Sequence, residues 1–366
     1  MTFLSSGAKL GGEERYLELL LGGLGADWVE EVVFLEHGPF EERLRALGYE
    51  THVLPTSRRA LGIGRSALRL RRRLRRRQPT VVHANGVKGA LVSALATPGR
   101  LPFIWVKHDF SWDGPLARFV GSRARTVVAV TSAVAETFGP RTGRKVRVVH
   151  NGTPAVAVDR ADGRRRLAEA LGDPEPRAVV SLVGRLDPAK GHRELLAVAP
   201  ALVRAVPGLR IALMGAAYAP FLGYESELRA EVAAAGLDGT VAFLGHREDA
   251  RELLAGSEAV VIPTVVDARG MGREGFSYVA LESMAVGTPV VAYRHGGLPE
   301  IVADCARLVP AHDRAALRES VLEVLADEAL RSRMGECGRA RAASRFSVER
   351  MVEEMKDVYR RAANAA

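Results

Sequence analysis

Short apolar runs rich in valine alternate along this chain with stretches whose apolar residues recur every three or four positions. An apolar run bounded by turn residues predicts a buried strand, and the three-to-four spacing predicts an amphipathic helix. The expected strands are 3–6, 29–35, 51–54, 80–83, 103–107, 127–131 and 146–150, followed by 178–183, 210–214, 241–244, 259–263, 290–293 and 307–309. We therefore predict the α/β class, with one doubly wound parallel sheet in each half of the chain.

The boundary between the two halves is predicted by a strong turn signal, Asn151-Gly152-Thr153-Pro154. We place an N-terminal Rossmann-like domain at 1–153 and a C-terminal Rossmann-like domain at 154–346. A chain of 366 residues is long enough for two domains that each bury a core.

Composition describes a globular protein, with 47% apolar residues and mean hydropathy near zero. The chain has no run of about 18 apolar residues, and its start lacks a basic leader before an apolar stretch, so we expect neither a membrane span nor export. Cys305 and Cys337 form no disulfide framework and have no metal-ligand spacing, which favours a reducing cytoplasm. The abundance of arginine and alanine suggests a bacterial source.

A net charge of +9 is concentrated in the stretch Arg65–Arg77, where leucines alternate with arginines. Such a helix can lie on an anionic membrane surface, which would place the protein at the inner face of the cell membrane. The alternative is a solvated helix face beside the core. No aromatic residues or known RNA- or DNA-binding motif accompany the arginines, so nucleic acid is not expected as a partner.

Two glutamates, Glu274 and Glu282, stand eight positions apart in the second half of the chain. Glu274 is placed at the mouth of a predicted helix and Glu282 two turns inside it, roughly 12 Å along. The backbone amides of Gly275, Phe276 and Ser277 would form a phosphate cradle at this helix N-terminus. The alternative is that both glutamates are ordinary charges on an exposed helix.

A second motif, Gly184-Arg185-Leu186-Asp187-Pro188-Ala189-Lys190-Gly191, directly follows a predicted strand. Arg185 can grip two phosphate oxygens as a planar fork, and Lys190 adds a mobile point charge. Fixed cations here would stabilise a diphosphate leaving group as it gains negative charge. The alternative is a surface turn with two ordinary basic side chains.

Three further loops follow predicted strands and are candidate ligand contacts. Gly11 and Gly12 open a helix, where backbone can approach an anion, although a tight turn would use the same residues. His108 ends a buried strand and is expected to face the ligand, although an isolated histidine is more often a polar core residue. Gly245 lies in the loop 243–247, whose contacts would come mainly from the backbone.

These motifs together resemble the retaining glycosyltransferases of family four, which have the GT-B fold of two Rossmann-like domains facing across a cleft. The resemblance covers nearly the whole chain and is most specific over 181–302. It implies a retaining hexosyltransferase in which Glu274 and His108 contact the donor sugar, Arg185 and Lys190 bind the diphosphate, and Glu282 binds the ribose.

The same resemblance implies further contacts and partners. The Gly11-Gly12 loop would face the donor phosphates, and the loop containing Gly245 would meet the nucleobase. The donor is expected to be a UDP-sugar, and the final segment, 347–366, would pack back on the first domain. No Asp-x-Asp occurs, and two cations already face the phosphates, so we expect neither a metal nor another cofactor.

Departures from the family pattern leave the substrates open. Ser277 and Tyr278 stand where many relatives have Gly and a small aliphatic residue, and the loop 264–273 is long, carrying Asp267, Arg269 and Gly270. The acceptor is expected to be a sugar, a lipid-linked molecule or a small molecule. The alternatives are a nucleotide-sugar epimerase of the same fold and a natural-product glycosyltransferase with a fully soluble acceptor.

Overall fold

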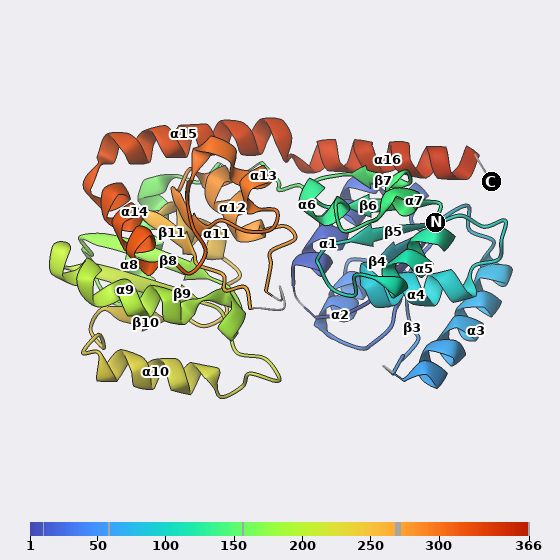
Figure 1. The fold of residues 1–366 in the computed structure, drawn as a ribbon, viewed down its shortest axis with the longest axis horizontal. Coiled ribbons are helices and arrows are strands. Elements are labelled where there is room, and N and C mark those ends of the chain that lie inside the picture. The colour runs from blue at the N-terminus through green and yellow to red at the C-terminus, as the bar shows by residue number, and fades with distance from the viewer. Residues whose placement is uncertain (10, 58, 156, 268–271, 365–366) are drawn as a thin grey trace. The chain divides into compact units, whose positions relative to one another are not determined.

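The computed structural model describes residues 1–366 except 10, 58, 156, 268–271 and 365–366. The described chain separates into two compact units (Figure 1). The first unit contains residues 1–152 and 346–366, and the second contains residues 153–345. Each unit is built on one parallel sheet and is described by itself below.

The first unit has a seven-stranded parallel sheet with the strand order β3-β2-β1-β4-β5-β6-β7. Its strands are β1 (Thr2–Ser5), β2 (Glu31–Phe34), β3 (Thr51–Val53), β4 (Val82–Asn85), β5 (Phe103–Lys107), β6 (Thr126–Ala129) and β7 (Val146–Val148). Its α-helices are α1 (Gly12–Leu24), α2 (Pro39–Ala46), α3 (Ala60–Arg77), α4 (Gly86–Ala96), α5 (Pro115–Arg123), α6 (Ser132–Ala135), α7 (Pro140–Gly143) and α16 (Val348–Asn364).

The second unit has a six-stranded parallel sheet with the strand order β10-β9-β8-β11-β12-β13. Its strands are β8 (Ala178–Val183), β9 (Leu209–Met214), β10 (Val241–Phe243), β11 (Ala259–Ile262), β12 (Val290–Tyr293) and β13 (Arg307–Val309). Its α-helices are α8 (Arg160–Leu171), α9 (His192–Ala205), α10 (Tyr224–Ala234), α11 (Ala250–Ala255), α12 (Tyr278–Val286), α13 (Leu298–Val302), α14 (Arg314–Ala326) and α15 (Glu328–Arg345).

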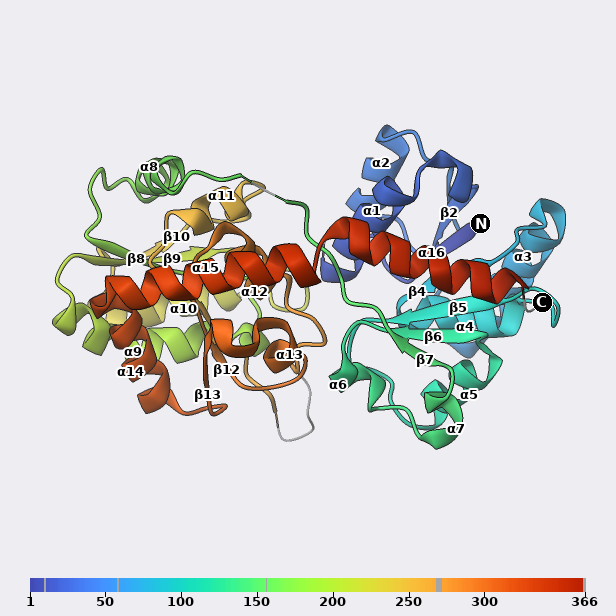
Figure 2. The same cartoon turned by 90° about the horizontal axis from the view of Figure 1, so that it is seen from above.

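The sequence pattern predicts both sheets correctly, because central strands such as β5, β11 and β12 are mainly apolar and buried along their length. In the second unit, α9, α10 and α14 pack together on one face, while α8, α11, α12 and α15 pack on the other (Figures 1 and 2). In the first unit, α3, α4 and α5 cover one face, and α1 packs against α16 on the other.

Strand order reverses once in each sheet. The reversal lies between β1 and β4 in the first unit and between β8 and β11 in the second. Such a switch point leaves a crevice outside the carboxyl ends of the two strands, which is where open α/β sheets bind ligands. In each unit, we therefore expect ligand-binding residues in the loops at the carboxyl ends of the two strands that flank the switch point.

The last helix, α16, belongs to the first unit. The side chains of Tyr359 and His83 share a hydrogen bond of 2.7 Å between the phenol oxygen and Nδ1. His83 is fully buried on β4, and burial lowers its pKa to about 3, so its ring is neutral. Phe3 of β1 packs against both rings.

The prediction of no disulfide is wrong. Cys305 and Cys337 form a disulfide with an S–S distance of 1.98 Å, which links the turn after α13 to α15. The pair is separated by 32 residues, a spacing that carries no signal in the sequence. Cysteine usage therefore gives no support to a reducing compartment.

None of the helices in the described part of the chain is long and apolar enough to cross a membrane.

Candidate functional site

The switch point of the second sheet carries an ion pair between two residues that the sequence nominates. The Lys190 ammonium lies 2.6 Å from Oε1 of Glu274, and the same carboxylate oxygen accepts a hydrogen bond of 3.2 Å from the Thr264 hydroxyl. Lys190 follows β8 in a single 3-10 turn, and Thr264 follows β11. The two strands that flank the switch point thus deliver a cation and a hydroxyl to one carboxylate.

The loop geometry holds these side chains in place. Asp187 caps the 3-10 turn by accepting a hydrogen bond from the Ala189 amide at 2.9 Å. Gly191 follows with φ +74°, and a Cβ there would lie 1.8 Å from the Pro263 carbonyl oxygen. Only glycine fits this close approach of the two loops.

Glu274 is ionised in this setting. Burial acts to raise its pKa, but the charge and hydrogen bond of Lys190, with help from the hydrogen bond of Thr264, lower the pKa below the ordinary value. The site therefore holds a carboxylate and an ammonium in direct contact, with 13% and 28% of their side chains exposed.

His295, which was not nominated from the sequence, contacts the same residue. Its Nδ1 accepts the Glu274 backbone N–H at 3.4 Å, and burial lowers its pKa, so the neutral ring carries its proton on Nε2. That Nε2 is buried and has no hydrogen-bond partner among the described residues. The Glu274 carbonyl in turn accepts a 2.8 Å hydrogen bond from the Gly297 amide, which fixes the backbone of Glu274.

Arg185 lies on the same loop but stands apart from this pair. Its side chain is 57% exposed, and its nearest acidic partner is Asp187 at 3.6 Å. An exposed guanidinium in the loop after β8 is available to an anionic ligand.

Glu274 does not lie at the mouth of a helix as predicted. The helix α12 begins at Tyr278, with Ser277 as its N-cap; the Ser277 hydroxyl accepts from the Ala280 amide at 3.3 Å. Gly275 and Phe276 precede the cap in a bend of the backbone. The predicted helical rise of 12 Å between Glu274 and Glu282 therefore does not apply. The serine at position 277 supplies this cap.

Glu282 is inside α12 and is held by a residue that the sequence did not nominate. Arg251 of α11 donates from Nη2 to Glu282 Oε1 at 3.1 Å and to the Thr153 hydroxyl at 3.2 Å. Both charged side chains are largely buried, at 13% and 21% exposure. One carboxylate oxygen of Glu282 is thus engaged, and the other has no hydrogen-bond partner among the described residues.

Gly245 lies in the loop after β10 with φ +66°. Its carbonyl accepts a 2.7 Å hydrogen bond from the Gly215 amide, which ties this loop to the one after β9. Open space surrounds the position of a Cβ at Gly245, so a flat ligand could approach the backbone closely. The predicted residues Arg269 and Gly270 lie outside the described residues.

In the first unit, His108 follows β5 beside the switch point. Its Nε2 lies 2.7 Å from Oδ1 of Asn85, whose Nδ2 donates to the Glu13 carbonyl at 3.2 Å. Asn85 therefore presents its oxygen to His108, and Nε2 carries the proton. Burial lowers the pKa of His108 to about 4, so the neutral ring offers a lone pair on Nδ1. His108 would accept, rather than donate, a hydrogen bond from a sugar hydroxyl.

Gly11 is the N-cap of α1 and Gly12 its first residue, and both are exposed. The first turn carries Glu13 and Glu14, which compete with a phosphate for this helix N-terminus. Burial raises the pKa of Glu13 to about 8, with smaller contributions from the charges of Asp109 and Glu14, opposed by Lys107. A neutral Glu13 weakens the repulsion of an anion at the first turn.

Of the predicted residues in the second unit, Lys190 and Glu274 contact each other directly. Glu282 lies in α12, and Gly245 lies in the loop after β10. His108, Gly11 and Gly12 gather at the switch point of the first unit. Among the residues that the structure describes, no three His, Cys, Asp or Glu side chains form a set of metal ligands.

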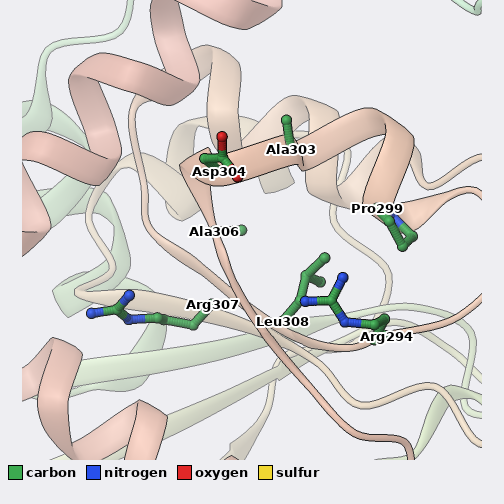
Figure 3. A pocket seen from close by; sticks show the side chains of 7 residues that line it. All are labelled: Arg294, Pro299, Ala303, Asp304, Ala306, Arg307 and Leu308. Atoms are coloured by element: carbon green, nitrogen blue, oxygen red, sulfur yellow. The ribbon is translucent and has the colours of Figure 1, made fainter.

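A surface pocket of about 440 Å³ in the second unit contains none of these residues. It is lined by Arg294, Pro299, Ala303, Asp304, Ala306, Arg307 and Leu308 (Figure 3). Figure 3 shows the Arg307 side chain pointing away from Arg294, and Arg307 already contacts Glu323 at 2.5 Å. The two cations do not converge on one ligand, so this pocket is not a candidate site.

Residues 10–155 match the family described as Glycosyltransferase Family 4, and residues 163–341 match Glycosyl transferases group 1. A GDP-mannose-dependent monoacylated alpha-(1-6)-phosphatidylinositol monomannoside mannosyltransferase of Corynebacterium glutamicum is 32% identical over 209 residues, which are 56% of this chain and 52% of that protein. A D-inositol 3-phosphate glycosyltransferase of Nocardioides sp. is 30% identical over 284 residues, 70% of this chain and 60% of that protein. The chain thus spans about half the length of the curated relatives it matches.

Solved structures resemble the chain over nearly its whole length. Anabaena Alr3699/HepE, in complex with UDP and glucose, superposes with a TM-score of 0.83 at 23% identity, covering 98% of each chain. Sucrose-phosphate synthase from Thermosynechococcus elongatus has a TM-score of 0.80 at 20% identity, covering 100% of this chain and 99% of that one. At this level of identity, the likeness concerns the fold.

Proposed function

Because the chain belongs to glycosyltransferase family 4 and has the GT-B fold, we propose that it transfers a hexose from a nucleotide-diphosphate sugar to a hydroxyl group, with retention of anomeric configuration. The observation that carries the proposal is the contact between Lys190 and Glu274 at the switch point of the second sheet. A cation for the diphosphate and a carboxylate for the sugar hydroxyls are held side by side, as the two adjacent parts of the donor require.

In the proposed reaction, the bond from the anomeric carbon to the diphosphate oxygen breaks, and a bond to the acceptor oxygen forms on the same face. The acceptor proton passes to the departing phosphate oxygen. Lys190 and Arg185 stabilise the charge that develops on the diphosphate, which is worth more in the transition state than in the ground state. Two side-chain cations serve this purpose, so the proposal needs neither a metal ion nor another cofactor.

The donor in this proposal is a UDP-sugar. The Anabaena structure of the same fold was solved with UDP and with UDP-glucose, whereas the Corynebacterium relative is named for GDP-mannose. Glu282 would bind the ribose hydroxyls through the oxygen that Arg251 leaves open. The backbone of the Gly245 loop would meet the nucleobase, and a backbone contact distinguishes poorly between uridine and guanosine.

The acceptor in this proposal is a hydroxyl of a sugar or cyclitol, either lipid-linked or as a small molecule. The names of both curated relatives contain inositol, in one case attached to a lipid. These names support a ring with several hydroxyl groups as the acceptor class.

The proposal includes contact of the first unit with an anionic membrane surface, at the inner face of a cytoplasmic membrane. The helix α3 lies at the edge of the first unit in both views (Figures 1 and 2), and its buried face is Ser66, Ala67, Leu70 and Leu74. The opposite face exposes Leu61 and Leu68 at 79% and 60%. The exposed arginines on and beside that face are Arg65, Arg69, Arg72, Arg75 and Arg76, for which no ion pair occurs among the described residues. Leucines between arginines suit a surface with anionic headgroups above acyl chains.

A variant that tests membrane binding must keep the arginines of α3 that form ion pairs within the first unit. Arg73 contacts Glu31 at 2.5 Å, and Arg77 pairs with Glu50, so both are structural. Replacement of Arg65, Arg69, Arg72 and Arg76 by Gln should abolish sedimentation with vesicles that contain phosphatidylserine. The matched control replaces Arg100, Arg118, Arg141 and Arg144, which are exposed elsewhere on the first unit. Equal loss in both variants, or no loss in the first, would contradict a specific role for α3.

A specific observation keeps an epimerase as the second candidate. That reaction requires carboxylic groups in the first unit, and Glu13 and Asp109 lie near the switch point there. Incubation with UDP-N-acetylglucosamine alone, followed by proton NMR, separates the candidates. A new 2-epimer signal without an acceptor would support the epimerase.

The transfer is tested by incubation with UDP-glucose or GDP-mannose and D-inositol 3-phosphate or methyl α-D-mannopyranoside. We expect nucleoside diphosphate release together with a new α-anomeric proton signal. Replacement of Lys190 by Ala should lower kcat by about 10²–10³-fold, the usual effect of removing one group that stabilises developing charge. A β-linked product, or full activity in the variant, would contradict the proposal.

A further inference from the structure

A groove of about 580 Å³ lies in the first unit between the edge of its sheet and the last helix, α16. Figures 1 and 2 show α16 passing beside β7, which is the last strand of that sheet. One wall of the groove comes from β7 and the start of β6, and the other wall comes from α16. The groove contains none of the residues assigned to the nucleotide sugar.

The two walls of this groove carry opposite charges. The strand wall contributes Arg125, which directly precedes β6, and Arg147, in the middle of β7. The helix wall contributes the carboxylates of Glu353, Glu354 and Asp357. Arg125, Arg147, Glu353 and Asp357 are all exposed, so their charged groups can reach another molecule.

The arginines of the strand wall are not neutralised within the chain. Neither Arg125 nor Arg147 has an ion pair or a side-chain hydrogen bond among the described residues. The carboxylates pair only with cations on their own helix: Glu353 lies 2.8 Å from Lys356, and Asp357 lies 2.8 Å from Arg361. Exposed pairs within one helix are weak, so these carboxylates can also take a cation from outside.

Apolar side chains lie between the charged walls. Val148 of β7 is 37% exposed, whereas Val149 and Val358 are buried beneath the groove. An edge strand is the part of a sheet that is open to another chain. An apolar strip with charged groups around it has the anatomy of a protein–protein interface.

We infer that this groove is the contact between two copies of this chain, related by a two-fold axis. A two-fold interface uses the same patch on both partners. The axis sets the arginine wall of each copy against the carboxylate wall of the other, so the same attractive contact is made twice.

The balance of charge selects a second copy over a partner of one sign. Three arginines and three carboxylates line the groove, so its charges cancel. An acidic chain would be attracted by the arginines and repelled by the carboxylates, whereas a second copy presents both signs. Two β7 strands paired about Arg147 would place like charges opposite each other, which is destabilising. We therefore expect contact through the walls of the groove and not through a continuous sheet.

The test is sedimentation velocity on the full chain at low ionic strength. The wild type should form a dimer whose population rises with protein concentration and falls with added salt, which screens exposed charges. Arg125→Glu/Arg147→Glu and Glu353→Arg/Asp357→Arg should each raise the dimer Kd by about a hundredfold or more, because like charges then meet across the interface.

A mixture of the two double variants tests the self-complementary arrangement itself. The groove of the first variant is mainly acidic and that of the second mainly basic, so the mixture should form a dimer that contains one copy of each. A fluorescent label on one variant identifies this mixed species. The matched control is Arg100→Glu/Arg118→Glu, which makes the same change of charge at exposed positions outside the groove and should dimerise as the wild type does.

The variants replace exposed side chains, so all of them should keep the circular dichroism and the melting point of the wild type. A monomeric wild type, a dimer that the groove variants weaken no more than the control does, or a mixture that stays monomeric would overturn the inference. A monomeric wild type that binds poly-L-glutamate through Arg125 and Arg147 would replace the second copy by an acidic partner. Dimer formation does not depend on the proposed function, and a failure of either leaves the other in place.

Discussion

Replacement of Lys190 by Met tests the ion pair that organises the second unit. The change keeps an unbranched side chain of similar length but leaves the Glu274 carboxylate, only 13% exposed, without its cation. The hydrogen bond of 3.2 Å from Thr264 remains. An unpaired and largely buried charge costs about 1–3 kcal/mol. The value of 3–5 kcal/mol for fully buried pairs does not apply, because Lys190 is itself 28% exposed.

The pH dependence identifies the cause. In the wild type the pKa of Glu274 is lowered, so the stabilisation by the pair is fully present above about pH 4.3 and is lost as the pH falls through the lower, folded-state value. In Lys190→Met the main opposing charge is gone, and burial raises the pKa of Glu274. The variant then gains a proton on folding, so its deficit is largest at neutral pH and shrinks towards pH 5.

Calorimetry at pH 7.5 and pH 5 measures both effects. With about 2 kcal/mol lost, the melting point of Lys190→Met should fall by roughly 4–8 °C at pH 7.5. The double variant Lys190→Met/Glu274→Gln should recover much of this loss, because it removes the unpaired charge. Arg318→Met, which breaks an exposed pair with Glu319, is the control and should cost less than about 1 kcal/mol. A deficit that is the same at both pH values, or additive losses in the double variant, would refute the reasoning.

Three further predictions concern residues that support the site and the fold. Arg251→Ala should weaken binding of UDP by about tenfold, since Glu282 loses its 3.1 Å partner; isothermal titration measures this, and unchanged affinity would contradict it. Tyr359→Phe should lower stability by about 1–3 kcal/mol by leaving His83 Nδ1 unpaired, with kcat unchanged; equal stability in denaturant titrations would count against the buried bond. Reduction of the Cys305–Cys337 bond should cost about 3–4 kcal/mol for a closed loop of 32 residues; a thiol titration of the unfolded chain that finds two free thiols would disprove the disulfide.

The fold could be predicted from the sequence because the strands are short valine-rich runs separated by clear turn residues. The strands β11 and β12 are buried along their whole length, so they appear in the sequence as short apolar runs. Strand order was not readable in detail, because it depends on which strands pair in space rather than on any local pattern.

The Lys190 and Glu274 candidates could be found because each follows a strand in a recognisable motif. The start of α12 was misplaced although Gly275 disfavours a helix, because the cap at Ser277 depends on its side-chain hydrogen bond to the Ala280 amide. A Ser-x-x-Ala pattern is weaker than a capping box, so only the geometry reveals it.

Other interactions in the structure could not be predicted from the local sequence around their residues. Glu13 reads as an ordinary helix-opening acid. It becomes unusual only when Gly86 and Asp109, both distant in sequence, surround it. Arg251 and Glu282 are separated by 31 residues, and Cys305 and Cys337 by 32, so each pair exists only after the chain has folded.

The most direct test of the central claim is a thermal-shift titration with UDP-, GDP-, ADP- and TDP-sugars on the wild type, Arg185→Ala and Glu282→Ala. A ligand that binds only the folded protein raises the melting point with the logarithm of its excess over Kd. We predict a shift with a UDP-sugar that is reduced or lost in both variants. A wild-type protein that shifts with none of the four, or variants that shift as the wild type does, would contradict a nucleotide-sugar site at the switch point of the second sheet.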